Sequence, residues 1–360
     1  MRRLPNIAVV GCGYWGPNLV RNYRSNPDCR LKVICDRDES RLEKMHELYP
    51  DVALETNVDR VLEDPNIDAV VIAVPVCHHY ELAKKSLLVG KHVFLEKPMA
   101  SSSAQCEELV ELSNQQGLIL MVGHTFLYSP AVRMIKELID SGAIGRIRYI
   151  SARRLNLGLY QKDINVVWDL SPHDLSIIIY VMDQSPVELN CRGKASLSPS
   201  IHDVSNMSLL FKDGGFATIH NSWLDPKKVR DMAIVGDNKM IVYDDLEPIQ
   251  KIKIYDTRVE QHLSSPEQNT DLQVSYHHGG MHAPYISQEE PLKLETRHFI
   301  DCVVNHAKPL TCGSQGLELV RILEAATKSM QEFGSRVKID DHYPICCEEC
   351  WKGGEACVHT

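Results

Sequence analysis

The sequence predicts an α/β fold in its first third and an α+β fold with a mostly antiparallel sheet in the rest. Two patterns predict this division. Between residues 6 and 123, apolar runs alternate with helix-like segments, as in a doubly wound parallel sheet. From residue 146, strand-like runs are joined by short turns rich in Gly and Asp, which indicates antiparallel hairpins. We therefore expect domains at 1–123 and 124–340, and a Cys-rich tail at 341–360.

In the first domain, glycines and prolines mark the ends of the expected elements. Pro75 ends a continuous apolar run of the kind that is buried on both faces of a parallel sheet. Gly90 and Gly117 are suited to helix C-caps. In order, after the first two strands, we expect a helix over 40–48, a strand over 66–74, a helix over 79–89, a strand over 91–95, a helix over 103–116 and a strand over 118–122.

The second domain is expected to begin with a helix over 129–141, because Gly142 is a suitable stop. Two hairpins are predicted beyond it, with turns at 212–215 and 236–239. Helices over 292–306 and 317–333 follow the sheet. One face of this sheet should stay open, and oligomers often cover such a face, so we expect a homodimer or homotetramer.

Composition and charge fit a globular protein that acts on small molecules. The apolar fraction of 44% and the charged fraction of 24% are ordinary, and the net charge of −9 argues against nucleic-acid binding. No apolar run approaches the ~20 residues of a membrane span. The first strand starts almost at once, which leaves no room for a signal peptide. A cytoplasmic protein without nucleic-acid or membrane partners is expected.

The first strand, Asn6–Val10, runs directly into a GxGxxG motif formed by Gly11, Gly13 and Gly16. The first glycine permits a tight turn, the second lets the backbone approach a pyrophosphate, and the third allows close helix packing. The helix N-terminus that follows favours phosphate charge. A strand, this motif and a helix together predict a Rossmann dinucleotide-binding fold.

The next apolar run ends in Asp36, which lies 20 residues past Gly16. A carboxylate at this place hydrogen-bonds the ribose hydroxyls of the adenosine and repels a 2′-phosphate, so NAD is the expected cofactor. The neighbouring Arg37 can instead hold that phosphate, which keeps NADP as the second option.

Lys97, within Glu96-Lys97-Pro98, follows a predicted parallel strand at the sheet edge where ligands bind. The Lys-Pro bond is also a candidate for the cis form, which would fix the direction of the lysine. Taken alone, the segment is equally compatible with an exposed lysine before a turn.

Asp169 and His173 stand four residues apart, near a predicted helix start with Ser171 as cap and Pro172 in the first turn. Alcohol oxidation needs a group that takes the hydroxyl proton while hydride leaves the carbon. A histidine suits this task, and a carboxylate can orient it and stabilise its charged form. Without further context, a capping aspartate and a structural histidine explain the pair better.

The order of these motifs resembles the Gfo/Idh/MocA oxidoreductases over residues 5 to 335. The resemblance also rests on His79–Ala83 and Val89–Val93, and it does not cover the Cys-rich tail. It implies that Lys97 binds the reacting hydroxyl oxygen, that His173 is the base, and that Asp169 joins them in one proton-transfer unit. The strand ends and the resemblance together give the expected cofactor site: Gly11, Gly13, Tyr14, Trp15, Gly16, Asp36, Arg37, Val74, Pro75, His79, Glu96, Lys97 and Pro98.

Within that family, the segments 122–128, 154–158 and 163–173 resemble nucleotide-sugar 3-dehydrogenases that act on UDP-N-acetylglucosamine-type substrates. This implies oxidation at C3 of a nucleotide-linked N-acetylhexosamine to a 3-keto sugar. Arg153 and Arg154 adjoin on a predicted strand, so at most one should reach a given ligand. The expected substrate-binding residues are His124, Tyr128, Arg154, Asn156, Asn165 and Trp168.

Two other functions stay open. One is oxidation of an aminoglycoside, aminocyclitol or inositol-type substrate, which acidic residues would attract, although such charges more often lie on a solvated face. The acidic residues are Asp225, Asp231, Asp244, Asp245 and Glu247. The other is a non-catalytic sensor that uses the dinucleotide fold to bind partners. The joint presence of Lys97, Asp169 and His173 argues against a sensor.

Eight of the 12 cysteines are scattered, which is typical of reduced, buried thiols in a cytosolic protein. The tail has the spacing of zinc ligands, although a flexible tail with reactive thiols explains it as well. Its candidate ligands are His342, Cys346, Cys347, Cys350, Cys357 and His359. Another group, His277, His278 and His282, lies in a predicted loop. Since hydride transfer in the family needs no metal, we expect no bound metal ion in this protein.

Overall fold

The computed structural model describes residues 3–158, 160–161, 164–262 and 273–339. The chain forms two compact units. The first runs to Ser129 and is completed by Glu289–Glu324, and the second comprises 130–288 and 325–339. In the described part of the chain, no helix has both the length and the apolar character needed to cross a bilayer.

This division differs from the expected boundary at residue 123. Residues 124–129 and the helical segment after 288 lie in the first unit, because specific contacts join them there. Thr125 donates to Glu295 at 2.7 Å, Tyr128 lies 3.1 Å from the Thr311 hydroxyl, and Met121 forms a β-bridge with Cys312. These contacts span more than a hundred residues of sequence, which a local pattern does not report.

The first unit contains the predicted doubly wound sheet, with all six strands parallel in the order β3-β2-β1-β4-β5-β6. The strand order reverses between β1 and β4, which is where such sheets bind ligands. The strands are β1 Asn6–Val10, β2 Arg30–Cys35, β3 Ala53–Glu55, β4 Ala69–Ile72, β5 His92–Glu96 and β6 Leu120–Gly123.

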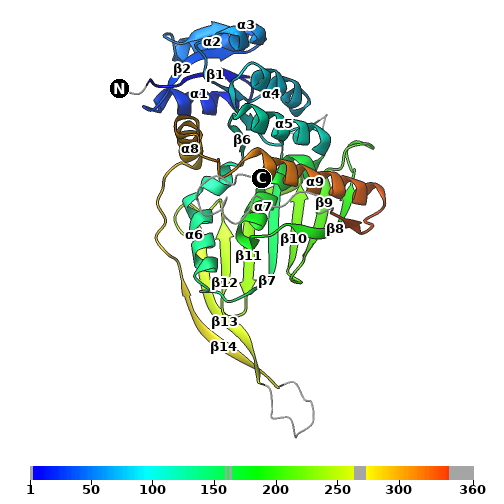
Figure 1. The fold of residues 1–360 in the computed structure, drawn as a ribbon. Coiled ribbons are helices and arrows are strands. Elements are labelled where there is room, and N and C mark those ends of the chain that lie inside the picture. Colours follow the sequence, from blue (N-terminus) through cyan, green and yellow to red (C-terminus); the bar gives the residue numbers. More distant parts are fainter. Residues whose placement is uncertain (1–2, 159, 162–163, 263–272, 340–360) are drawn as a thin grey trace. The chain divides into compact units, whose positions relative to one another are not determined.

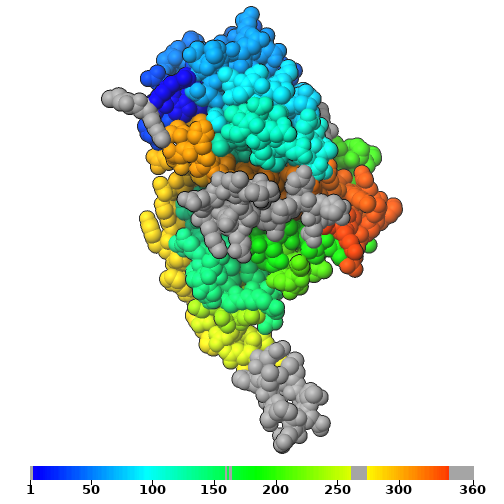
Figure 2. Space-filling view, viewed as in Figure 1, coloured from blue at the N-terminus to red at the C-terminus, as the bar shows by residue number. Residues whose placement is uncertain are grey.

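Right-handed connections place α1 and α2 on one face of this sheet and α4 and α5 on the other (Figure 1). The helix α5 has the predicted bounds, with Ser102 as N-cap and Gly117 in the left-handed conformation. The helices α4 and α5 lie side by side, and Lys84 pairs with Glu108 across them. Their residues contribute to the light-blue to cyan surface in Figure 2. The helices are α1 Gly16–Ser25, α2 Glu39–Leu48, α3 Val58–Glu63, α4 His79–Leu88, α5 Ser103–Gln116 and α8 Pro291–Asn305, with 3-10 turns η1 Val76–His78 and η2 Thr125–Tyr128.

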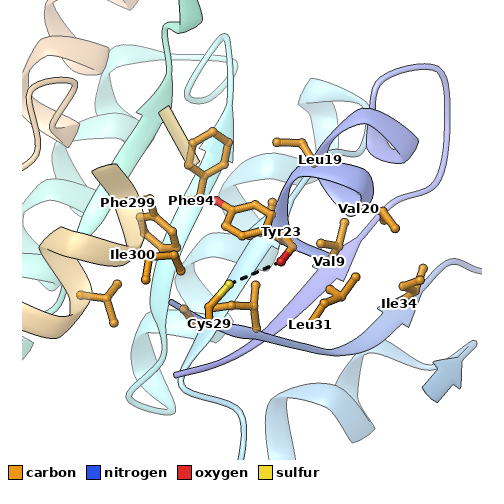
Figure 3. Close-up of a cluster of buried hydrophobic side chains, with 14 of the residues drawn as sticks. Val9, Leu19, Val20, Tyr23, Cys29, Leu31, Ile34, Phe94, Phe299 and Ile300 are labelled. Carbon is orange, nitrogen blue, oxygen red and sulfur yellow. Dashed lines mark hydrogen bonds between the residues drawn. The ribbon is translucent and has the colours of Figure 1, made fainter. Parts of the chain in front are cut away.

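Three aromatic side chains join α1, β5 and α8 in the core of the first unit (Figure 3). Tyr23, Phe94 and Phe299 are fully buried, and their rings meet edge to face at centroid distances of 5.6–6.4 Å. Such pairs contribute about 0.5–1.5 kcal/mol each beyond the burial of apolar area. The late helix α8 is therefore part of the core that supports the strand ends.

The second unit contains a nine-stranded sheet in the order β14-β13-β12-β11-β7-β10-β9-β8-β15, in which only the β10–β7 pair is parallel. Both predicted hairpins are present, as β9–β10 and β11–β12. The strands are β7 Ile147–Leu157, β8 Pro186–Lys194, β9 Val204–Phe211, β10 Phe216–Ser222, β11 Leu224–Gly236, β12 Met240–Asp244, β13 Ile252–His262, β14 Gln273–His282 and β15 Val337–Lys338.

One face of this sheet packs on α7 Val166–Met182, a helix that is buried along most of its length (Figure 1). The helix α6 Pro130–Asp140 packs on α7, and α9 Gly313–Gln331 belongs to the second unit from residue 325 onward. On strands β7, β9 and β10, Tyr149, Leu210 and Phe216 are exposed cross-strand neighbours. The open sheet face expected from the sequence therefore carries apolar side chains.

Candidate functional site

The turn between β1 and α1 has the geometry of a dinucleotide-binding loop. Gly11 has φ +101°, and a Cβ atom there would lie 2.4 Å from the carbonyl oxygen of Ala73. A Cβ at Gly16 would lie 1.9 Å from the oxygen of Gly11. At Gly13 the nearest such atom is Arg41 Nη1, at 3.6 Å, so the backbone there is open to a ligand. Close packing thus requires glycine at positions 11 and 16. At position 13, the absence of a side chain leaves space for a pyrophosphate to approach the backbone.

Asp36 is held in place at the end of β2. Its Oδ2 accepts from the Cys12 amide at 2.6 Å, and its Oδ1 accepts from the Asp38 amide at 2.9 Å. The guanidinium of Arg41 lies 3.6 Å from Oδ2, whereas Arg37 is exposed. A carboxylate in this position keeps lone pairs for ribose hydroxyls. Arg41 was missed in the sequence because it lies on the next helix, outside the motif.

The Glu96-Lys97-Pro98 segment follows β5 and contains a cis Lys97–Pro98 bond, as the sequence indicated. The buried ring of His79 braces this segment: Nδ1 lies 2.8 Å from the carbonyl oxygen of Pro98 and Nε2 lies 2.8 Å from that of Val74. Burial lowers the pKa of His79, and a neutral ring donates from one nitrogen only. His79 was expected to contact the cofactor, but its hydrogen bonds go to the backbone.

The two residues after β6 that were expected to bind substrate differ in their surroundings. His124 is buried, and burial together with the charge of Lys97 lowers its pKa to about 3, so the ring is neutral. Neither ring nitrogen has a hydrogen-bond partner among the described residues, so a polar ligand can engage them. Tyr128 is fully buried and its hydroxyl contacts Thr311, so it has a structural contact, and its role at the substrate stays a prediction.

The helix that carries Asp169 and His173 starts earlier than predicted. Asn165 is the N-cap of α7, accepting from the amides of Val167 and Trp168, and Pro172 lies inside the helix. Asn165 caps the helix start, so neither Ser171 nor Pro172 marks it. Asp169 and His173 are one helical turn apart and therefore lie on the same face of α7.

Asp169 is oriented by a residue that the sequence analysis did not select. Its Oδ2 accepts from the indole nitrogen of Trp223 at 3.0 Å. The ring of Tyr160 packs edge to face on Trp223, with centroids 5.3 Å apart. Asn156, an expected substrate residue, lies beside Gly158 in the same region. Trp223 directly follows β10, and only the fold brings it to Asp169 of α7.

Arg154 is buried in an ion pair with Asp174 of α7. Its Nε and Nη2 donate to the two carboxylate oxygens at 2.9 Å each. Arg153 points to the other face of β7, is exposed, and pairs with Asp231. The opposite directions match the expectation from strand geometry. The Arg154 guanidinium is engaged by Asp174, and a contact of Arg154 with the substrate stays a prediction.

The comparisons with known proteins agree with this architecture. Residues 5–124 match the family described as "Oxidoreductase family, NAD-binding Rossmann fold", and residues 132–242 match the "GFO/IDH/MocA C-terminal domain". The chain belongs to the Gfo/Idh/MocA oxidoreductase family. Its cofactor is NAD, and the open backbone at Gly13 together with the fixed Asp36 fits this ligand.

Myo-inositol 2-dehydrogenase from Thermotoga maritima is 24% identical over 93% of this chain and 98% of its own length. Among solved structures, the UDP-N-acetylglucosamine 3-dehydrogenase GnnA from Acidithiobacillus ferrooxidans has TM-score 0.75 and 20% identity, covering 91% of this chain and 98% of that one. An oxidoreductase from Agrobacterium radiobacter, solved with NAD+, L-tartaric acid and magnesium, has TM-score 0.78 and 20% identity, covering 94% and 99%.

In this Gfo/Idh/MocA protein, Trp168 also has a structural contact, since its indole nitrogen donates to the Thr327 hydroxyl at 2.9 Å. Of the remaining expected cofactor residues, Tyr14 and Pro75 are exposed, and Val74 is half-buried. These three stay candidates for contacts with the bound dinucleotide.

The described cysteines are free thiols, and all but Cys77 are buried. Burial raises the pKa of several of them, such as Cys35 and Cys191, to about 12, so they are poor nucleophiles at neutral pH. The tail cysteines lie outside the described residues. Within the described ranges, no three His, Cys, Asp or Glu side chains are grouped to hold a metal, and His277 instead pairs with Asp256.

Proposed function

We propose that this protein is an NAD-dependent dehydrogenase that oxidises a ring hydroxyl of a sugar, most specifically C3 of a nucleotide-linked N-acetylhexosamine, to a 3-keto product. The observation that carries the proposal is the pair formed by Asp169 and His173, one turn apart on α7, in a chain whose other unit binds NAD. The name of one structural neighbour, a UDP-N-acetylglucosamine 3-dehydrogenase, supports this substrate class.

The proposed chemistry divides between the two units. When bound, NAD accepts the hydride that leaves the carbinol carbon. His173 takes the proton of the hydroxyl, and Asp169, held by Trp223, stabilises the imidazolium that forms. Lys97 donates to the hydroxyl oxygen and stabilises its developing negative charge.

The second candidate substrate class is an inositol, aminocyclitol or aminoglycoside. Two observations favour keeping it. One full-length relative is named a myo-inositol 2-dehydrogenase, and Arg154, the arginine first expected to face the substrate, is engaged by Asp174. A diphosphate would therefore need other cationic partners. A non-catalytic NAD-binding sensor is the third candidate function. The joint presence of Lys97, Asp169 and His173 argues against it.

The test is reduction of NAD by the purified protein with UDP-N-acetylglucosamine, its uronic acid, unphosphorylated aminosugars and myo-inositol. Turnover with a nucleotide sugar supports the first class. Turnover with myo-inositol or a free aminosugar alone moves the assignment to the second. Tight NAD binding without turnover on any of them favours the sensor.

We further propose that the protein is cytoplasmic and forms a homodimer or homotetramer through the open face of the second sheet. Tyr149, Leu210 and Phe216 form an exposed apolar patch there, and a single domain seldom leaves such a patch uncovered. Sedimentation of the wild type and of Phe216→Glu tests this. A change toward the monomer supports the interface, and an unchanged mass excludes it.

A further inference from the structure

Glu96 lies at the end of β5, directly before Lys97, and its carboxylate rests on the backbone of β6. A Cβ atom at Gly123 would come within 3.1 Å of both carboxylate oxygens, so the glycine makes room for them. Oε1 is buried and has no hydrogen-bond partner among the described residues. Trp15, in the dinucleotide-binding turn, interacts with the Glu96 side chain and lowers its pKa. Glu96 therefore couples to that turn and directly precedes Lys97.

Burial raises the pKa of Glu96 to about 7, while the charge of Lys97, the backbone amide of Lys97 and the side chain of Trp15 lower it. An indole N–H can only donate, so the interaction with Trp15 favours the charged carboxylate. Glu96 thus gains its charge near neutral pH, and that charge strengthens the contacts with both Trp15 and Lys97.

A second carboxyl group interacts electrostatically with the first. Glu295 of α8 is fully buried, and its Oε2 accepts from the hydroxyl of Thr125, two residues after Gly123. Its Oε1, like that of Glu96, has no partner among the described residues. Burial first, and then the charge of Glu96, raise the pKa of Glu295 well above its ordinary value.

The other titratable groups that interact with this acid pair are few. From α1 comes the hydroxyl of Tyr23, which is buried and whose pKa is raised by burial and by both glutamates. Lys97 is the cation on the strand end itself. We call the two carboxyl groups the Glu96–Glu295 pair. If both were ionised, their negative charges would repel each other with little solvent screening. The charge on either carboxyl group therefore disfavours ionisation of the other.

The fold rule for doubly wound sheets assigns the nicotinamide to the half of the sheet that contains β5, the strand that carries Glu96. Asp36 on β2 marks the adenosine half, and β5 belongs to the other half of the doubly wound sheet. We propose that Glu96 sets the charge at the nicotinamide end of the cofactor site, and that Glu295 is its neutral partner. When ionised, Glu96 favours the oxidised cofactor, whose nicotinamide ring is cationic, over the neutral reduced ring.

This inference rests on NAD binding and is independent of the sugar that is oxidised. The test measures the Kd of NAD+ and of NADH for the full-length protein, without substrate, from about pH 5.5 to about pH 8.5. The fluorescence that depends on Trp15, obtained by comparison with Trp15→Phe, is recorded over the same range. In the wild type, the preference for NAD+ over NADH should rise several-fold with pH, and the Trp15 signal should change with the same midpoint.

Glu96→Gln keeps the shape of the side chain and removes its ionisation. It should abolish both pH transitions. Glu318→Gln is the matched control, because Glu318 is another buried glutamate of the first unit whose pKa burial raises to about 7, and it should keep both transitions. A cofactor preference that still changes with pH in Glu96→Gln, or that does not change in the wild type, overturns the proposal.

Glu295→Gln tests the role of the second carboxyl group, because glutamine mimics a neutral glutamic acid. The midpoint should stay where it is in the wild type. A midpoint that falls by about one pH unit or more would show that Glu295 is charged and would overturn its assignment as the neutral partner. If Glu96→Gln does not fold, Trp15→Phe serves in its place. Loss of the indole donor should move the transition in cofactor preference to higher pH, and an unmoved transition contradicts the link between Trp15 and Glu96.

Discussion

His79 braces Pro98: the ring Nδ1 lies 2.8 Å from the carbonyl oxygen of Pro98, although 19 residues separate the two in sequence. The opposite ring nitrogen lies 2.8 Å from the carbonyl oxygen of Val74. One imidazole thus connects the loop after β4 to the segment that carries Lys97. The position of Lys97 therefore depends on a side chain that is itself buried.

His79→Leu should lower the free energy of unfolding by about 1–3 kcal/mol, because the buried carbonyl that the ring satisfies loses its donor. It should also raise the Kd for NAD, since the Lys97 segment loses its brace. Urea denaturation and fluorescence titration measure the two effects. The exposed neighbour His78 provides the control, and His78→Leu should leave both values within error of the wild type. Equal effects at the two positions would exclude the bracing role.

Arg154→Met should lower the free energy of unfolding by about 3–5 kcal/mol, because it leaves the buried carboxylate of Asp174 without its partner. The double variant Arg154→Met/Asp174→Leu should recover part of that loss. Arg153→Met breaks an exposed ion pair with Asp231 and should cost less than about 1 kcal/mol. Urea denaturation of the four proteins gives the comparison. A small loss in Arg154→Met would favour ligand binding as the role of this arginine.

Lys97→Met should leave the affinity for NAD nearly intact and reduce turnover by several orders of magnitude, because it removes the cation that binds the hydroxyl oxygen. The comparison is between the Kd of NAD and kcat on whichever sugar the wild type oxidises. Lys85→Met, at a solvent-exposed position on α4, should not change either value. Turnover at the wild-type rate in Lys97→Met would remove Lys97 from the mechanism.

Glu318 predicts a specific dependence of stability on pH. Burial raises its pKa from 4.5 to about 7 in the folded protein, so the folded state holds a proton that the unfolded state releases. Stability is therefore lost as the pH rises from about 4.5 to about 7, by about 3 kcal/mol for this group. Glu318→Gln should match the wild type at low pH and be more stable by roughly that amount above pH 7. Parallel curves of unfolding free energy against pH for the two proteins would contradict the burial of an ionising carboxyl group.

The sequence by itself determined the features that depend on neighbouring residues. The GxGxxG turn is one, because only glycine tolerates φ +101° at Gly11 and the backbone contact at Gly16. The helix α5 is another, since Ser102 and Gly117 mark its two ends. The parallel sheet and both hairpins followed from apolar periodicity and turn residues, which are also local properties.

Tertiary structure decided how the polar side chains are used. Arg154 could serve a phosphate or a carboxylate, and the choice of Asp174 follows only when β7 packs on α7. Asp169 finds Trp223, and Glu96 finds Glu295, across 54 and 199 residues of sequence. Asp174 and Trp223 each satisfy a group that packing has removed from water, and the cost of leaving such a group unpaired selects those contacts. Glu96 and Glu295 instead raise each other's cost of ionisation. A local pattern holds no record of that cost, because it arises only when distant segments exclude solvent together.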